Sequence, residues 1–224
     1  LVVKEKADLG IVVDPDVDRL AIICEDGSMF GEEYTLVACA DYVLGRTTGN
    51  TVSNLSSSSA LRDITVKHGG SYQASAVGEV NVVELMKSTN AIIGGEGNGG
   101  IIYPQSHYGR DSLVGVALFL SHLANLRISC KELRSGYPDY YMCKKKVDLS
   151  PQINVDAILE SIASNYKNEE IFTIDGLKIN FKSEWVHLRK SNTEPIIRIY
   201  TESTSQKGAD ELANKLIKEI KKGA

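Results

Sequence analysis

Hydrophobic and polar positions alternate in two different ways along this chain of 224 residues. Up to residue 136, short apolar runs rich in Ile and Val alternate with longer segments whose apolar residues recur at helical spacing. This alternation predicts an α/β fold, in which a mixed or mostly parallel sheet carries helices on both faces. We expect strands at 9–13, 20–24, 51–55, 71–76 and 91–93, and helices at 33–44, 59–68, 80–87 and 111–126.

The run at 9–13 is apolar at every position except Gly10 and ends directly at Asp14. A strand that is buried on both faces of a parallel sheet has such a continuous pattern. We therefore expect 9–13 to be a buried parallel strand.

Beyond residue 136 the pattern changes to several short strands in succession, flanked by two helices. The last helix places its apolar residues on one face: Ala209, Leu212, Ala213, Leu216, Ile217 and Ile220. This part predicts a smaller α+β domain. Its expected strands are 140–147, 171–174, 177–181, 185–189 and 196–201, and its first helix is 156–166. We divide the chain into 1–47, the end of one α/β domain, 48–136, a second α/β domain, and 137–224, the α+β domain.

Composition and charge narrow the class of protein. Hydrophobic residues make up 42% and charged residues 24%, as in an ordinary globular protein, and the net charge of -4 argues against nucleic-acid binding. The longest apolar stretch, 113–126, is shorter than the roughly 20 residues of a membrane span. The four cysteines form no Cys-x-x-Cys pair, which favours reduced, buried thiols in a cytoplasmic protein. Because the chain begins at Leu1 rather than Met, we expect a piece of a longer protein.

The first segment with chemical potential is 14–19, Asp-Pro-Asp-Val-Asp-Arg, at the end of the predicted strand 9–13. Three carboxylates in a tight loop suit a hard divalent cation such as Mg²⁺, and without a cation they repel one another. An EF-hand does not fit, because Arg19 stands where that loop needs glycine. Two alternatives stay open on this segment alone: an acidic loop that caps the next element, and a haloacid-dehalogenase-type site with Asp14 as nucleophile and Asp16 as acid or base.

The second segment, 94–100, contains five glycines and only two side chains, Glu96 and Asn98. Glycines allow the backbone to approach a ligand closely, and a carboxylate with an amide supplies the acceptors and the donor that sugar hydroxyls need. The dinucleotide-binding pattern Gly-x-Gly-x-x-Gly followed by a helix is absent. The segment predicts a sugar-binding loop, with a simple glycine-rich turn as the alternative.

The third segment runs from Arg189 to Arg198 and joins two predicted strands. Arginine binds phosphate oxygens through two parallel hydrogen bonds, and hydroxyl and amide groups add further donors. The segment predicts a phosphate-binding loop rather than a solvated charged hairpin. Its candidate ligands are Arg189, Ser191, Asn192, Thr193 and Arg198.

In this order along the chain, the three segments resemble the α-D-phosphohexomutase superfamily, which includes phosphoglucomutase/phosphomannomutase and phosphoglucosamine mutase. The family's metal loop Asp-Gly-Asp-x-Asp-Arg matches 14–19 with Pro15 in place of glycine. Its sugar loop Gly-Glu-x-x-Gly matches 95–99, and its phosphate loop Arg-x-Ser-Asn-Thr-Glu-Pro-x-x-Arg matches 189–198 at every defined position. A haloacid-dehalogenase site would explain neither of the last two segments.

The resemblance implies an enzyme of four domains, of which this chain would contain the end of the second, the third and the fourth. The family's catalytic phosphoserine lies in a Ser-His-Asn loop of the first domain, and no Ser-His-Asn occurs here. The intact enzyme would interconvert hexose 1-phosphate and 6-phosphate of glucose, mannose or glucosamine through a bisphosphorylated sugar. We expect the chain alone to be inactive, and the alternative is a non-catalytic module that binds sugar phosphates.

The resemblance also assigns roles to individual residues. Mg²⁺ would bind Asp14, Asp16 and Asp18, and Arg19 would offset charge on the transferred phosphoryl group. Glu96 and Asn98 would hold sugar hydroxyls, and the five residues of the phosphate loop would hold the non-reacting phosphate. The expected partner is a hexose phosphate, not nucleic acid or a membrane, and the intact enzyme is expected to be a cytoplasmic monomer or dimer.

Overall fold

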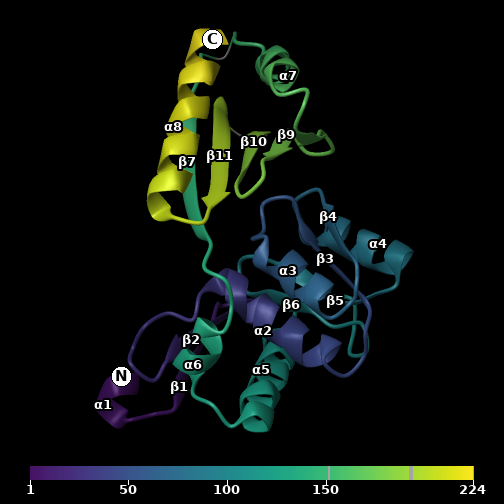
Figure 1. Ribbon diagram of the computed structural model, residues 1–224, viewed down its shortest axis with the longest axis vertical. Coiled ribbons are helices and arrows are strands. Elements are labelled where there is room, and N and C mark those ends of the chain that lie inside the picture. Colours follow the sequence, from purple (N-terminus) through teal and green to yellow (C-terminus); the bar gives the residue numbers. More distant parts are fainter. Residues whose placement is uncertain (151, 192–193, 224) are drawn as a thin grey trace. The chain divides into compact units, whose positions relative to one another are not determined.

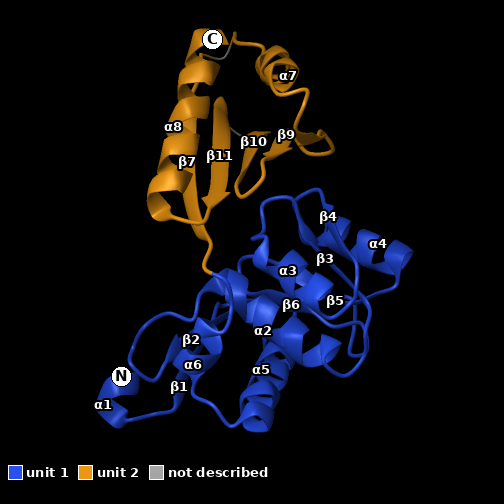
Figure 2. Ribbon diagram, viewed as in Figure 1, with its two compact units in different colours: residues 1–138 blue, residues 139–224 orange. Residues whose placement is uncertain are grey.

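A computed structural model, which describes residues 1–150, 152–191 and 194–223, shows two compact units, Leu1–Pro138 and Asp139–Ala224 (Figure 2). The first unit contains a four-stranded sheet and a separate two-stranded sheet, the second contains a five-stranded sheet, and each unit has its own helices (Figure 1). The division of the chain at residue 47 stays a prediction, and in the structure α2 (Glu32–Leu44) contacts β5 (Ala91–Glu96) within the first unit.

The first unit is built on a four-stranded mixed sheet with the order β4-β3-β5-β6. The central strand β3 (Asn50–Asn54) is parallel to β4 (Tyr72–Ser75) and to β5, whereas β6 (Gly100–Ile102) is antiparallel to β5.

Helices cover both faces of this sheet, as successive residues of β3 show. Thr51 Oγ1 lies 2.7 Å from Thr65 Oγ1 of α3 (Ala60–Lys67), whereas Val52 packs with apolar residues of α4 (Glu79–Thr89). Because neighbouring strand residues point to opposite faces, α3 and α4 cover opposite sides. The predicted α/β fold with a mixed sheet and helices on both faces is confirmed.

Two long helices, α2 and α5 (Ser112–Leu126), pack against each other beside the sheet. The small side chains of Ala38, Cys39 and Ala40 are fully buried, and the Cys39 thiol lies 3.5 Å from the carbonyl oxygen of Gly115. Burial raises the pKa of the Cys39 thiol to about 12, so this cysteine is a structural side chain. All four cysteines are buried and unpaired, as predicted.

The sequence analysis did not predict α6 (Cys130–Ser135), a short helix after α5. Its N-cap is Ser129, whose hydroxyl accepts a hydrogen bond from the backbone N–H of Glu132. The pattern Ser-x-x-Glu is the sequence sign of such a cap, and it could have identified the helix.

The prediction of a buried parallel strand at 9–13 is wrong in two respects, its pairing and its burial. β1 (Leu9–Val13) is a strand, but it pairs with β2 (Leu20–Cys24) in an antiparallel hairpin that follows the short helix α1 (Val2–Glu5). Its residues Ile11, Val12 and Val13 are 44%, 50% and 39% exposed, and no other strand of the described residues pairs with β1. A continuous apolar run therefore did not distinguish a buried strand from a half-covered one.

The second unit is a five-stranded antiparallel sheet with the order β7-β11-β10-β9-β8. The helices α7 (Val155–Asn165) and α8 (Gln206–Gly223) contribute to one apolar core with the side chains of alternate strand residues. The smaller α+β fold is thus confirmed. Its strands are β7 (Tyr141–Asp148), β8 (Glu170–Phe172), β9 (Leu177–Asn180), β10 (Trp185–Lys190) and β11 (Ile196–Ser203).

Candidate functional site

The acidic loop between β1 and β2 is closed by its own first carboxylate. Asp14 Oδ1 accepts hydrogen bonds from the backbone N–H groups of Asp18 and Arg19, at 3.1 and 3.2 Å. Burial acts to raise the pKa of Asp14, but these two hydrogen bonds, together with the Asp18 side chain and the Arg19 charge, outweigh it, and the pKa is lowered. The first residue of the loop is therefore an ionised carboxylate near neutral pH.

The loop is also fixed to the start of α5. Val17 has a φ of 57°, a left-handed conformation that is strained for a β-branched residue. The Ser112 hydroxyl donates a hydrogen bond of 2.7 Å to the Val17 carbonyl oxygen, which helps to hold this turn in place. Backbone strain of this kind is found where a loop must present its side chains in a fixed way.

The glycine-rich segment is a hairpin rather than a long loop. β5 continues to Glu96 and β6 begins at Gly100, so the turn contains only 97–99. Gly99 has a φ of 83° and its carbonyl oxygen accepts a hydrogen bond of 3.0 Å from Leu20 N, the first residue after the acidic loop. A Cβ on Gly99 would collide with the Leu20 carbonyl oxygen, so this close contact of the two loops requires glycine.

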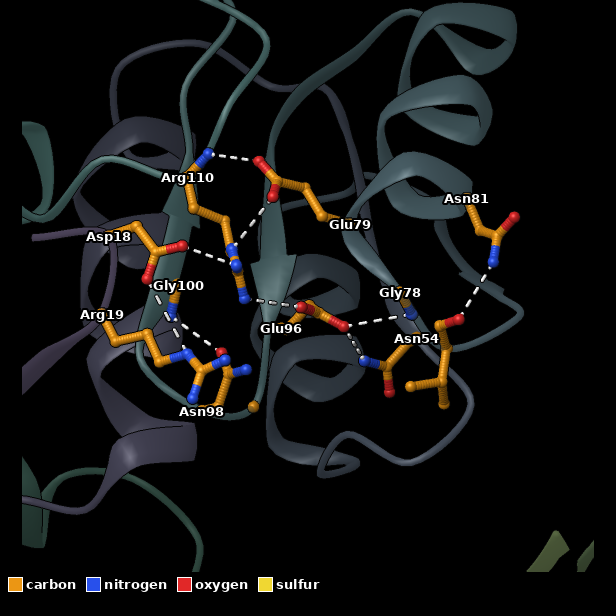
Figure 3. A network of polar contacts seen from close by, with 12 residues as sticks. Asp18, Arg19, Asn54, Gly78, Glu79, Asn81, Glu96, Asn98, Gly100 and Arg110 are labelled. Carbon is orange, nitrogen blue, oxygen red and sulfur yellow. Dashed lines mark hydrogen bonds and ion pairs between the residues drawn. The ribbon is translucent and has the colours of Figure 1, made fainter. Parts of the chain in front are cut away.

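Arg110 links the two loops through three carboxylates (Figure 3). Its Nη2 lies 2.5 Å from Asp18 Oδ2 of the acidic loop, and its Nη1 lies 3.1 Å from Glu96 Oε2 of the hairpin. Its Nε lies 3.2 Å from Glu79 Oε2 at the start of α4. The Arg110 side chain is only 14% exposed, so the low-dielectric surroundings strengthen these ion pairs.

Glu96 has a partner on each carboxylate oxygen. Oε1 accepts hydrogen bonds from Asn54 Nδ2 at 2.9 Å and from the backbone N–H of Gly78 at 3.2 Å, and Oε2 is bound by Arg110. The residue is 6% exposed. Its predicted contact with a sugar hydroxyl stays a prediction, and the structure adds that Glu96 joins β3, α4 and the hairpin in one buried network.

A cavity of about 250 Å³ lies between the acidic loop and the hairpin. Three of the predicted site residues, Asp14, Arg19 and Asn98, line it. Arg19 is half exposed and its Nε lies 3.8 Å from both Asp14 Oδ2 and Asp18 Oδ1. The remaining lining residues are Val12, Val13, Leu20, Ala21 and Glu32.

The donor chemistry of the acidic loop suits Mg²⁺, since carboxylate oxygens are its preferred protein ligands. Asp18 Oδ1 is buried and has no hydrogen-bond partner among the described residues. A buried oxygen of this kind is suited to bind a cation. The described residues hold no ready-made group of three His, Cys, Asp or Glu ligands, and Asp16 is exposed. Mg²⁺ binding by Asp14, Asp16 and Asp18 stays a prediction.

The predicted phosphate loop joins β10 and β11 in the second unit. Arg189 and Arg198 are directly opposite each other in the strand pair, so their side chains are on the same face of the sheet. Arg189 Nε lies 2.8 Å from Asp175 Oδ2, whereas Arg198 is exposed. At the loop, Ser191 Oγ accepts a hydrogen bond of 3.3 Å from Glu194 N; Asn192 and Thr193 lie outside the described residues.

The sequence analysis did not commit to several residues of this site, among them Arg110, Glu79 and Asn54. Asn54 is the last residue of β3, and ligands of open α/β sheets bind at the carboxyl ends of the parallel strands. The position of Asn54 at the end of a predicted strand could therefore have marked it as a site residue. Arg110 had no comparable signal, because its three carboxylates come from segments 14 to 92 residues away. Only the tertiary structure brings these charges together.

Comparisons with known proteins agree with this fold. Residues 31–140 match the family model described as phosphoglucomutase/phosphomannomutase, alpha/beta/alpha domain III. Residues 143–219 match the C-terminal domain of the same family. The chain belongs to the phosphoglucomutase/phosphomannomutase family, which confirms the resemblance drawn from the three motifs.

Individual relatives show how much of the family's length is present. The chain is 37% identical over 222 residues to the phosphoglucosamine/phosphogalactosamine mutase of Sulfurisphaera tokodaii. This alignment covers 97% of the chain and 48% of that relative. The chain thus spans about half the length of the curated relatives that it matches.

Solved structures share the fold. A phosphoglucomutase/phosphomannomutase family protein from Burkholderia thailandensis has a TM-score of 0.85 at 24% identity, over 99% of this chain and 48% of that one. The Aspergillus fumigatus N-acetylphosphoglucosamine mutase, solved in complex with GlcNAc-6P and magnesium, has a TM-score of 0.65 at 16% identity, over 94% and 51%. Within the described part of this chain, every helix is too short or too polar to span a membrane.

Proposed function

We propose that the protein to which this chain belongs is a phosphohexomutase, which interconverts hexose 1-phosphate and 6-phosphate through a phosphoserine and a bisphosphorylated sugar. Its substrate would be a phosphate of glucosamine, glucose or mannose. This chain supplies sites for metal, sugar and phosphate but no Ser-His-Asn segment, and it is inactive by itself. The observation that carries the proposal is the cavity between the acidic loop and the hairpin, lined by Asp14, Arg19 and Asn98.

In this proposal Arg19 acts in the chemical step. Its half-exposed guanidinium lies at the edge of the cavity, and it balances the negative charge that develops on the transferred phosphoryl group. Asp14, Asp16 and Asp18 would hold Mg²⁺, which when bound supplies further stabilisation of that charge. The magnesium present in the structure of the N-acetylphosphoglucosamine mutase supports this choice of ion.

In this proposal the hairpin of β5 and β6 and the phosphate loop position the substrate. Asn98, which lines the cavity, and Glu96, at the base of the hairpin, would hold sugar hydroxyls. Arg189, Ser191, Asn192, Thr193 and Arg198 would hold the non-reacting phosphate. A phosphate held at a distance from the reaction positions the reactive end of the sugar and lowers the entropic cost of the transfer.

A coupled assay of the full-length protein on glucosamine, glucose and mannose 1-phosphates tests the proposal. We expect turnover of at least one substrate, a fall in kcat of about 100-fold in Arg19→Gln, and a raised KM in Arg198→Gln. The 224-residue chain alone should give no turnover. A full-length protein that binds these sugar phosphates in calorimetry but converts none of them would instead support the alternative, a non-catalytic sugar-phosphate-binding module.

A further inference from the structure

Three cations form one row across neighbouring strands of the second unit. In the register of the sheet, Arg189 of β10 is opposite Arg198 of β11, and Arg198 is in turn opposite Lys146 of β7. Side chains that are directly opposite have Cβ atoms about 5 Å apart on the same face. The sequence places Lys146 more than forty positions before the phosphate loop, and only the sheet brings it beside the two arginines.

The row lies on the face of the sheet that the helices do not cover. Its neighbours in β7 and β11, Val147, Ile197 and Ile199, belong to the core under the helices, so Lys146 and Arg198 point the other way. Lys145, the residue before Lys146, also confirms the alternation, because its Nζ lies 2.8 Å from Asn214 Oδ1 of α8. Lys146 is thus, with Lys144, one of two lysines of β7 whose side chains are on the face away from the helices.

The protein itself neutralises this row only in part. Arg189 is paired with Asp175 at 2.8 Å, and Lys146 Nζ lies 3.8 Å from Asp148 Oδ1, a contact between side chains that are 60% and 80% exposed. Arg198 makes no ion pair with a carboxylate of the described residues. Like charges that are directly opposite destabilise a sheet. An anion bound at this row would offset the positive charge that Asp175 and Asp148 leave.

Lys146 is also close to the loop that joins the two arginines. The backbone N–H of Leu149, just after β7, donates a hydrogen bond of 2.8 Å to the Pro195 carbonyl oxygen, and Asp148 is opposite Ile196. The end of β7 is thus tied to the end of the phosphate loop. Lys146 precedes Asp148 by two residues, so its side chain is on the same face, opposite Arg198.

We propose that Lys146 is a third cation of the phosphate site, which binds the phosphate dianion of a sugar phosphate together with Arg189 and Arg198. This inference rests on the proposed function of the 189–198 loop and extends its binding site to β7. The arginine forks fix the orientation of the phosphate, whereas the lysine contributes a mobile point charge and one donor. No covalent step is involved.

Titration of the 224-residue chain with inorganic phosphate, followed by backbone amide chemical shifts at pH 7.5, measures the effect directly. We expect Lys146→Gln to raise the phosphate dissociation constant about three- to fivefold, as for loss of one exposed charge pair, and Lys146→Arg to stay within about twofold of the parent. Lys144→Gln is the matched control, since Lys144 is on the same strand and face but opposite Tyr200, and it should have no effect.

Arg198→Gln separates the two proposals. Phosphate binding that is lost in Arg198→Gln but unchanged in Lys146→Gln would overturn the role of Lys146 and leave the phosphate loop intact. Equal weakening by Lys144→Gln and Lys146→Gln would also overturn it, because a general loss of positive charge would then explain the effect. If the parent chain shows no phosphate-dependent shifts in residues 189–198, the phosphate site itself is wrong.

Discussion

The two units treat charge in opposite ways. In the first unit, Arg110 is largely buried and its single positive charge is shared by three carboxylates of the protein. In the second unit, Arg189, Arg198 and Lys146 are aligned on one face and have two carboxylates between them, of which one is a weak, exposed contact. The first cluster holds loops in place, and the second has charge left for a ligand.

This difference separates a positioning site from a binding site. Buried ion pairs depend on each other, because removal of one partner leaves the remaining charge without compensation in a low-dielectric environment. Exposed like charges gain from an added anion and lose little when one of them is removed. The following variants test this contrast, from the largest expected effect to the smallest.

The largest effect is expected for Arg110→Gln. Loss of the guanidinium leaves Asp18, Glu79 and Glu96 as neighbouring carboxylates without their common cation, and the free energy of unfolding should fall by about 3 to 5 kcal/mol. Hydrogen exchange of peptides from β5 and α4 in urea reports on this unit. Glu79→Gln, which removes the charge of the most exposed of the three partners, is the control and should lower the free energy of unfolding by less. A cost for Arg110→Gln below about 1 kcal/mol, as for a surface pair, would contradict a buried network.

Glycine substitutions should affect both units alike. Gly99 and Gly176 both have positive φ angles, 83° and 74°, and a Cβ at either would collide with a backbone carbonyl oxygen, of Leu20 and of Leu188 respectively. Alanine at each should lower the free energy of unfolding of its own unit by about 2 to 3 kcal/mol. Hydrogen exchange measures the first unit, and the fluorescence of Trp185, the single tryptophan, measures the second. A large difference between the two costs would mean that one unit relaxes its backbone and the other does not.

His187 should make the second unit sensitive to acid. Burial lowers the pKa of His187 from 6.5 to about 4, so the folded state binds fewer protons than the unfolded state between these values. Stability is therefore lost as the pH falls from about 6.5 towards 4, by about 2 kcal/mol at pH 4.5. Urea unfolding at pH 7.5 and 4.5, followed by Trp185 fluorescence, measures the free energy of unfolding at each pH. The fall in this free energy between the two pH values should be about 2 kcal/mol smaller in His187→Gln than in the parent. An identical loss in both proteins would assign the acid sensitivity to other groups.

The smallest effect on stability is expected for Arg198→Gln. Because Arg198 is exposed and opposite two cations, its removal should change the free energy of unfolding by less than about 0.5 kcal/mol, or raise it slightly. Added phosphate should stabilise the second unit of the parent but not of the variant. A cost above about 2 kcal/mol in phosphate-free buffer would show that Arg198 belongs to the folded core and would remove the contrast between the units.

The sequence was most informative where a local pattern determines the structure. Strand and helix periodicity predicted the α/β and α+β parts, and the closing helix 206–223 buries Ala209, Leu212, Ala213, Leu216 and Ile220, five of the six predicted residues. The three loop motifs correctly indicated the family because their residues are close in sequence.

Features that depend on distant segments could not be predicted in this way. The register that aligns Lys146 with Arg198 is set by the pairing of two strands about 50 residues apart, and no local pattern reports it. The apolar run at 9–13 predicted a strand correctly, but its exposure depends on what packs against it. The periodicity of a segment predicts its secondary structure, whereas its burial also depends on the other segments that pack against it.

The exposed hairpin of β1 and β2 has a practical consequence for work on the chain. β1 is an edge strand with Ile11, Val12 and Val13 in contact with solvent, and the unpaired backbone groups of such an edge can template the strand of another molecule. Concentrated samples should therefore self-associate through this edge before any loss of folded structure. The substitution Ile11→Lys, at a side chain that is 44% exposed and does not line the cavity, would act as a gatekeeper and keep the chain monomeric for spectroscopy.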